Sequence, residues 1–212
     1  NTVELKKHLF AVDVDGDRLP DLVYSGPGGE TELTRIYLNR RDSFELVFED
    51  YQYITEFRKE GGKLAGLQTG HAGPDAGYLF FTRDYQVKYD QGEVVFVRGK
   101  QHVSYENTEL PGRFYDTPVP FIAMADTMLL RASAAQLNEP YNPTLDTFGN
   151  IIARYRDKAR GVILAEKTRE KGNTWYFVEV YPDVMPSASI LYGTSGYPTF
   201  IRGWVSGKAV LK

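Results

Sequence analysis

Short runs of apolar and aromatic residues alternate with polar turns along the first half of the chain. Apolar and polar positions that alternate over roughly four to eight residues are typical of half-buried β-strands, and glycine, proline and aspartate mark the turns between them. Turn residues of this kind stand at 26–29, 61–62, 73–74 and 90–92. The pattern predicts strands at 9–12, 21–24, 33–38, 44–48, 64–69, 78–82, 85–89 and 94–98.

A polar, proline-containing stretch at 106–122 separates this half from the rest, and we interpret it as a stiff linker. From about residue 124 a new set of apolar strand patterns begins and continues to the end of the chain. We therefore predict an all-β protein with an N-terminal antiparallel domain at 1–123 and a second domain at 124–212.

The composition supports strands and excludes several classes of function. The 212 residues include 15 Tyr, 12 Phe and 2 Trp, which pack well on pleated surfaces. A net charge of -3 without a long basic run argues against a nucleic-acid partner. Apolar runs are too short for a membrane span. The absence of Cys excludes disulfides, thiolate metal sites and Cys nucleophiles.

An acidic loop between the first two predicted strands is the clearest candidate site. Asp13, Asp15 and Asp17 occupy positions 1, 3 and 5 of the loop, and Asp21 occupies position 9. Calcium takes six to eight oxygen ligands, and a tight turn with this spacing directs such oxygens inward, including the carbonyl of Leu19 at position 7. We predict a calcium site; the alternative is an Asp-rich turn held by Asx hydrogen bonds without a metal.

The loop is not an EF-hand, because Arg18 stands where that loop needs Gly and Tyr24 replaces its bidentate Glu. The aspartates together with Leu22, followed by the run 35–39, resemble an FG-GAP/VCBS repeat, a β-propeller blade motif. The resemblance implies a blade-like antiparallel sheet whose calcium mainly stiffens it. A faint second copy lies about 45 residues later, at 64–67, without the carboxylates.

The second domain resembles a bacterial SH3-like (SH3b) domain, which implies an SH3-like barrel. Its motifs are Leu130-Arg131 before a small residue, a Gly-led strand at 149–153, Trp175-Tyr176-x-Val178, and Gly203-Trp204-Val205. Two insertions, 134–148 and 181–201, depart from the family pattern. Because some members bind peptidoglycan, Trp175, Tyr176 and Trp204 are candidate ligand contacts; the alternative places the two tryptophans in the barrel core.

No catalytic constellation is apparent, and we predict no catalytic residue. The sequence contains neither a Gly-x-Ser-x-Gly elbow nor a phosphate-binding Gly-rich loop with Lys. His8, His71 and His102 are not spaced as metal ligands. Glycosidases use paired carboxylates, but Glu166 and Glu179, like Asp146, are as consistent with surface charges as with an acid-base pair.

These observations favour a non-enzymatic binding or scaffold protein. Its partner would be envelope glycan, peptide or protein, and calcium outside the cytoplasm suits the acidic loop, so we expect an exported, periplasmic or cell-surface location. Residue 1 is Asn, so we expect a leader to precede this chain. The alternatives are a cell-wall or polysaccharide hydrolase with its site between the domains, and a structural component that pairs through an open sheet edge.

Overall fold

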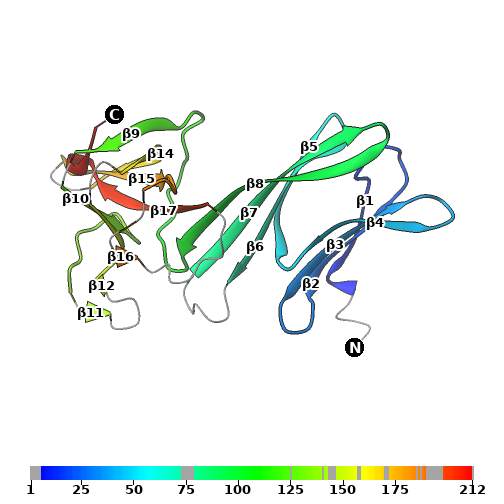
Figure 1. Ribbon diagram of the computed structural model, residues 1–212, viewed down its shortest axis with the longest axis horizontal. Helices are drawn as coiled ribbons and strands as arrows, with labels where there is room; N and C mark the ends of the chain where they lie inside the picture. Colours follow the sequence, from blue (N-terminus) through cyan, green and yellow to red (C-terminus); the bar gives the residue numbers. More distant parts are fainter. Residues whose placement is uncertain are drawn as a thin grey trace. The chain divides into compact units, whose positions relative to one another are not determined.

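The computed structural model describes residues 6–72, 79–124, 126–139, 141–142, 147–156, 159–169, 172–184, 186, 188–189 and 198–211 (Figure 1). The regular structure of these residues is almost entirely antiparallel β-strand, so the predicted all-β class is confirmed. Among the described residues, no helix is long and apolar enough to cross a membrane.

Contacts divide the chain into two compact units, but not at the predicted boundary of 123/124. Unit 1 contains Asn1–His71 and Phe81–Lys100, and unit 2 contains Ala72–Phe80 and Gln101–Lys212. The difference arises because the predicted linker is folded into unit 2. The N–H of Glu109 donates to the carbonyl of Ala132, and β9 (Val119–Ala123) pairs with β14 (Arg160–Thr168).

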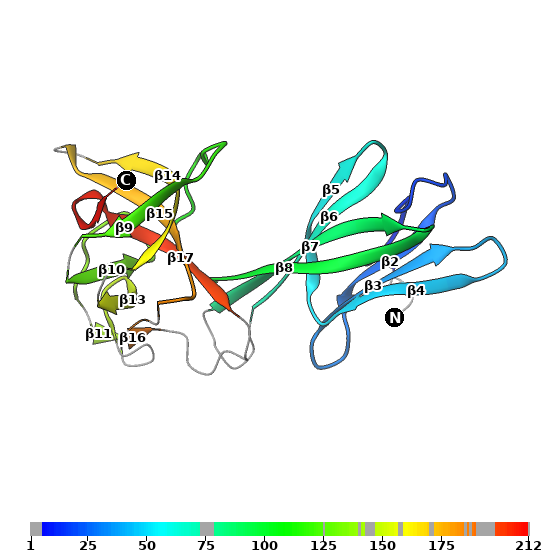
Figure 2. The same ribbon diagram turned by 45° about the horizontal axis from the view of Figure 1, so that its top comes forward.

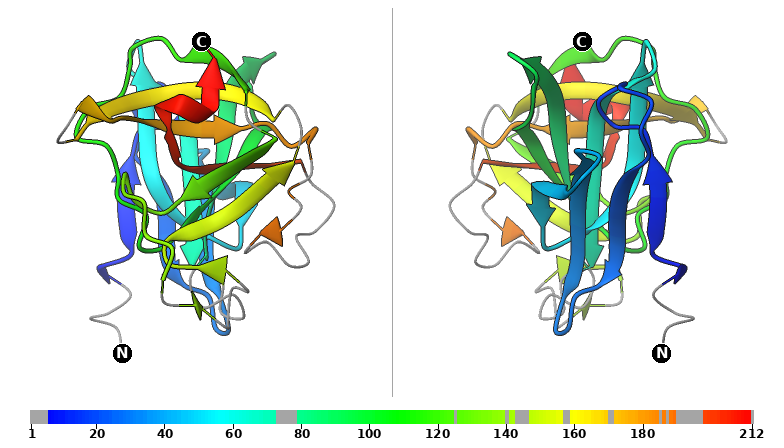
Figure 3. Two further views of the ribbon diagram at one scale, coloured as in Figure 1. Left: turned by 90° about the vertical axis from the view of Figure 1, so that its left-hand side faces the viewer. Right: turned by 90° about the vertical axis from the view of Figure 1, so that its right-hand side faces the viewer.

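Unit 1 begins with a four-stranded antiparallel sheet in chain order (Figure 1; the blue strands of Figure 3, right). Its strands are β1 (Leu9–Val12), β2 (Asp21–Pro27), β3 (Glu32–Asn39) and β4 (Phe44–Asp50). A second ladder in the order β8-β7-β6-β5 contains β5 (Tyr53–Glu60), β6 (Lys63–Ala72), β7 (Leu79–Asp90) and β8 (Glu93–Tyr105). The sequence pattern missed β5, because four of its eight residues are exposed and charged, which hides the apolar alternation.

The core of unit 1 forms where the inward faces of these strands meet. Val23, Ile36 and Leu38 come from the first sheet, and Leu64 and Leu67 from the second. Each is fully buried, and the inward residues of β2 and β3 alternate with less buried ones, as period-2 strands require.

A buried polar network crosses the same core. Asp50 accepts hydrogen bonds from Thr69 Oγ1 at 2.6 Å and the Tyr85 hydroxyl at 3.1 Å, and it pairs with Arg83 Nη1 at 2.6 Å. Gln52 Oε1 lies 3.0 Å from the Thr69 hydroxyl, whose single proton can serve only one of the two acceptors. Burial, together with the charge of Asp50, raises the pKa of Tyr85 to about 12, so this phenol stays protonated and keeps donating. The network joins the end of β4 to β6 and β7.

Unit 2 is built on three adjacent antiparallel strands, two of which contain the Trp175-Tyr176 and Gly203-Trp204 motifs (Figure 2; Figure 3, left). They are β14 (Arg160–Thr168), β15 (Thr174–Val180) and β17 (Thr199–Ser206). β9 (Val119–Ala123) and β18 (Val210–Leu211) extend the sheet beyond β14. β10 (Thr127–Arg131) and β13 (Ile151–Arg156) pair with each other and run at a steep angle to the three strands (Figure 3, left).

The ladder of described pairings in unit 2 does not close on itself. It runs from β18 through β9, β14, β15, β17 and β10 to β13, with the short β16 (Ala188–Ser189) at its end. The predicted insertions contain β16 and the two-residue strands β11 (Tyr141–Asn142) and β12 (Thr147–Phe148). The SH3-like barrel therefore stays a prediction.

Glu109 ties the former linker to this unit. Its carbonyl accepts a hydrogen bond from Trp204 Nε1, and its carboxylate pairs with Lys167 and, at 3.2 Å, with Arg169. The hydrogen bond from Lys167 is the main reason that the pKa of Glu109 is lowered. An acid whose pKa is lowered by folding stabilises the folded state above its unfolded pKa, and that stability is lost as the pH falls through the folded value.

We predict that Glu109→Gln destabilises unit 2 by about 1 kcal/mol at pH 7, discounted because the carboxylate is partly exposed. The loss should shrink as the pH falls below about 4, because the wild-type carboxyl then becomes neutral as well. Urea unfolding followed by tryptophan fluorescence measures this, since both tryptophans lie in unit 2. Glu106→Gln removes the same charge at an exposed position and serves as the control; an equal loss in both variants would contradict the prediction.

Candidate metal-binding loop

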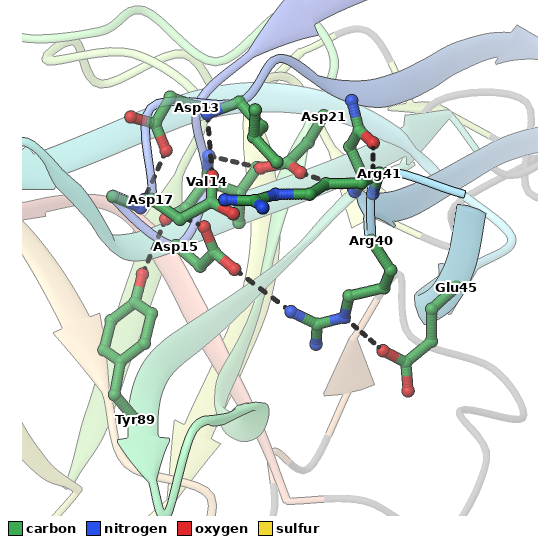
Figure 4. A network of polar contacts seen from close by, with 12 residues as sticks. Asp13, Val14, Asp15, Asp17, Asp21, Arg40, Arg41, Glu45 and Tyr89 are labelled. Atoms are coloured by element: carbon green, nitrogen blue, oxygen red, sulfur yellow. Dashed lines mark hydrogen bonds and ion pairs between the residues drawn. The ribbon is translucent and has the colours of Figure 1, made fainter. Parts of the chain in front are cut away.

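The acidic loop connects β1 to β2 and is closed at its base by the pairing of Val12 with Asp21. Its shape is fixed by Val14, whose side chain is fully buried in the core of unit 1. The carbonyl of Val14 accepts hydrogen bonds from the N–H of Leu64 at 3.0 Å and from the hydroxyl of Tyr89 at 2.7 Å (Figure 4). The backbone carbonyl of Val14 therefore holds the loop against β6 and β7.

Asx hydrogen bonds set the course of the chain through the loop. Asp13 accepts from the N–H of Gly16 at 2.7 Å and from that of Arg18 at 3.1 Å. Asp15 accepts from the N–H of Asp17 at 3.2 Å, and Asp17 accepts from the N–H of the residue two positions on at 2.7 Å. The bonds predicted for the metal-free turn are thus present. They do not exclude a cation, because each carboxylate oxygen has a second lone pair.

Three of the four predicted carboxylates converge. Asp13, Asp15 and Asp21 each place one oxygen within 4.8 Å of the others. Asp17 falls outside this group, and its Oδ1 instead caps the N–H of Leu19. The carbonyl of Leu19 stays a predicted ligand.

Asp21 is the buried member, with 1% of its surface exposed. Burial raises its pKa; the N–H groups of Asn39 and Val14, which donate at 2.8 and 2.7 Å, lower it, and the charges of Asp15 and Asp17 raise it again. The net shift is upward, so the environment disfavours the ionised carboxylate. A bound cation would offset that cost.

Basic side chains already surround the loop. Arg40 lies 3.4 Å from Asp15 and 2.8 Å from Glu45 (Figure 4). Lys59 Nζ donates to the carbonyl of Asp13 at 3.1 Å, and Lys63 Nζ lies 4.9 Å from the centroid of the Tyr89 ring. No local sequence pattern links these residues to the loop, because Arg40 follows β3 and the two lysines lie on β5 and β6.

The predicted aromatic ligand contacts are mostly core residues. Trp204 is fully buried beside Phe177, with ring centroids 5.3 Å apart, which corrects its assignment to a ligand surface. Trp175 belongs to the same cluster and is also buried, although its edge lines a hollow of about 340 Å³ with Arg169 and Lys208. Tyr176, on the opposite face of β15, is half-buried.

The histidines lie apart from the loop carboxylates. His71 Nδ1 lies 3.5 Å from Glu32, and His8 Nδ1 contacts the carbonyl of Ser25 at 3.1 Å. His102 is buried with Nδ1 2.9 Å from the carboxylate of Glu179, while Arg202 Nη2 lies 3.3 Å from Nε2.

The neighbours of His102 constrain its tautomer. Because the guanidinium of Arg202 can only donate, the contact at 3.3 Å requires Nε2 to accept, while Nδ1 lies 2.9 Å from the Glu179 carboxylate. Glu179 is 2% exposed, so it is not a surface charge. Asp146 lies outside the described residues, and Glu166 is exposed on β14.

No family model, curated protein or solved structure matches this chain. The resemblances to FG-GAP/VCBS repeats and to SH3b domains therefore stay predictions from the motifs that suggested them.

Two loop residues adopt the left-handed backbone region, Gly16 at φ 81° and Arg18 at φ 72°. Glycine is required at position 16, where an added Cβ would lie 2.7 Å from Lys63 Cγ. Arg18 occupies the position where the sequence comparison with EF-hands expects Gly. A side chain in this region costs roughly 1–2 kcal/mol, against roughly 0.5–1 kcal/mol for the extra unfolded-state entropy of glycine.

We predict that Arg18→Gly stabilises the calcium-free protein by about 0.5–1 kcal/mol, the difference between these two costs. Arg18→Ala keeps the Cβ and should bring no comparable gain. Calorimetric unfolding in the presence of a chelator measures both variants. A gain in Arg18→Ala equal to that in Arg18→Gly would assign the effect to the lost side chain instead of the backbone.

Proposed function

We propose that this protein is a non-enzymatic binding protein whose first unit is stiffened by calcium at residues 13–21. The observation that carries the proposal is the convergence of Asp13, Asp15 and the buried Asp21 in a loop whose backbone is already held by Val14. Carboxylate oxygens are the hard ligands that calcium prefers.

The three carboxylates fit such an ion. Calcium would supply positive charge beside Asp21, where burial makes the charge of the carboxylate costly. Asp21 links the loop to two strands, because its oxygens accept from Val14 in the loop and from Asn39 at the end of β3. A cation shared with Asp13 and Asp15 would therefore connect β1, β2 and β3. The expected result is a stiffer first sheet, with no reaction catalysed there.

The remaining parts of the proposal rest on the motifs. An exported, periplasmic or cell-surface location supplies calcium, and the SH3b resemblance supports a unit 2 that binds envelope glycan, peptide or protein. The hydrolase alternative gains nothing from the buried His102–Glu179 pair, because the second nitrogen of His102 already faces Arg202.

We predict that calcium raises the unfolding temperature of the protein and that chelator reverses the rise. At about 100 times its dissociation constant, calcium stabilises the folded state by about 2.7 kcal/mol, which corresponds to a shift of several degrees in calorimetry. Asp15→Asn should lose most of the calcium response, because it removes a ligand charge while keeping an oxygen to accept the N–H of Asp17.

Asp90→Asn is the matched control, since it removes one carboxylate from the exposed end of β7 in the same unit. It should leave the calcium response unchanged. A wild-type protein whose unfolding temperature is the same in calcium and chelator would refute the calcium proposal and leave a bare Asx turn.

We predict that calcium affinity rises with pH across the raised pKa of Asp21. In the calcium-free protein, a carboxyl with a raised pKa stabilises the folded state below its unfolded pKa of about 3.8, and that stability is lost as the pH rises through the folded value. Calcium binds the ionised form, so binding should release a proton at acidic pH and none near neutrality. Titration calorimetry in buffers of different ionisation enthalpy counts these protons; no proton release at acidic pH would show that Asp21 is not a ligand.

A further inference from the structure

A groove of about 780 Å³ lies in unit 1 between β1 and β5, apart from the carboxylates of the acidic loop. Phe10 and Val12, together with His8 just before the strand, line one wall. These residues are two apart in sequence, so one face of β1 looks into the groove. The opposite wall consists of five consecutive residues of β5, 53–57.

Consecutive residues on one wall show that the groove follows the edge of β5. Side chains of a strand point alternately to its two faces, so a groove over one face contacts every second residue. A groove that contacts consecutive residues runs along the backbone edge of the strand. Within the described residues, β5 pairs with β6 alone. Near one end of the groove the N–H of Ile54 points away from β6 and donates to Ser25 Oγ at 2.8 Å, so a partner strand would pair with the residues of β5 that follow Ile54.

The wall formed by β1 is apolar and exposed. Every residue of this strand, Leu9–Val12, is apolar, and Phe10 is 47% exposed. Tyr53 and Phe57 add aromatic surface from the side of β5. An apolar wall beside the terminal strand of a ladder is the arrangement that accepts an added strand, with backbone hydrogen bonds giving affinity and alternate side chains giving specificity.

Carboxylates surround the same groove. Glu30, Glu32 and Glu56 line it, and His8 is its only basic lining residue within the part of the chain that the structure describes. Glu32 lies beside His71 at 3.5 Å and Glu56 beside Arg58 at 3.8 Å, contacts too long to neutralise them strongly. The charge of the groove therefore favours a basic partner.

We propose that this groove binds an extended peptide segment of a partner protein in which apolar residues alternate with lysine or arginine. The segment pairs with the edge of β5, places its apolar side chains against Phe10 and Val12, and presents its basic side chains to Glu30 and Glu56. The proposal goes beyond calcium binding and does not depend on it, because the groove residues precede or lie outside residues 13–21.

The test uses a fluorescently labelled peptide of about seven residues, long enough to span the five groove residues of β5, with lysine alternating with valine and phenylalanine. Fluorescence anisotropy of the full chain should show saturable binding in calcium and in chelator alike. The same peptide with glutamate in place of lysine should bind at least tenfold more weakly. An analogue N-methylated at every internal amide has no donor on either strand edge and should also lose at least tenfold.

Protein variants locate the site. Phe10→Ala and the double variant Glu30→Lys with Glu56→Lys should each weaken binding about tenfold, and the exposed positions of these residues leave the fold intact, as circular dichroism would verify. The matched control, Glu60→Lys with Glu93→Lys, makes the same charge change outside the groove in the same unit and should bind as the wild type does.

Three results would overturn the proposal. Binding that survives amide methylation would show that no strand is added. Groove variants that bind as tightly as the control variant would place the peptide elsewhere, and an aliphatic amine that binds while the peptide does not would assign the groove to a small apolar ligand. Failure of calcium to stabilise the protein would leave all of these measurements unaffected, so the two proposals fail separately.

Discussion

The contact between the carboxylate of Asp21 and the N–H of Val14 is the constraint on which the first sheet depends. It places a buried charge at the point where β1 ends and β2 begins, and it turns Val14 into the core beneath the loop. The other oxygen of Asp21 holds the N–H of Asn39, so one carboxylate fixes the ends of three strands. An unpaired buried carboxylate is costly, and here two backbone donors offset the cost without neutralising the charge.

The strands of unit 1 were largely predictable because their physical cause is local. Residues of β2 and β3 alternate between core and surface, so apolar periodicity predicted them directly. β5 escaped prediction because it is an edge strand with four exposed charged residues, Glu56, Arg58, Lys59 and Glu60. These exposed charges erase the apolar alternation by which strands are recognised.

The composition of the acidic loop and the domain boundary depend on long-range contacts, and the sequence predicted them less well. The four aspartates indicated a metal loop, yet the structure brings only three of their carboxylates together. Arg40, from the turn after β3, and Tyr89, from β7, join them. The polar stretch 106–122 matched the composition of a linker, but Glu109 makes it part of unit 2 through Trp204 and Lys167. Composition describes what a segment exposes on average and contains no information about which partner buries it.

The contacts that fix the shape of the acidic loop are different from the groups that set its charge. The contacts of Val14 with Leu64 and Tyr89 and the Asx bonds of Asp13 fix the path of the backbone without any ion. The carboxylates that converge there remain mutually repulsive, and Arg40 relieves only Asp15, at 3.4 Å. A cation would therefore change the electrostatic cost of a preformed loop and would not fold it.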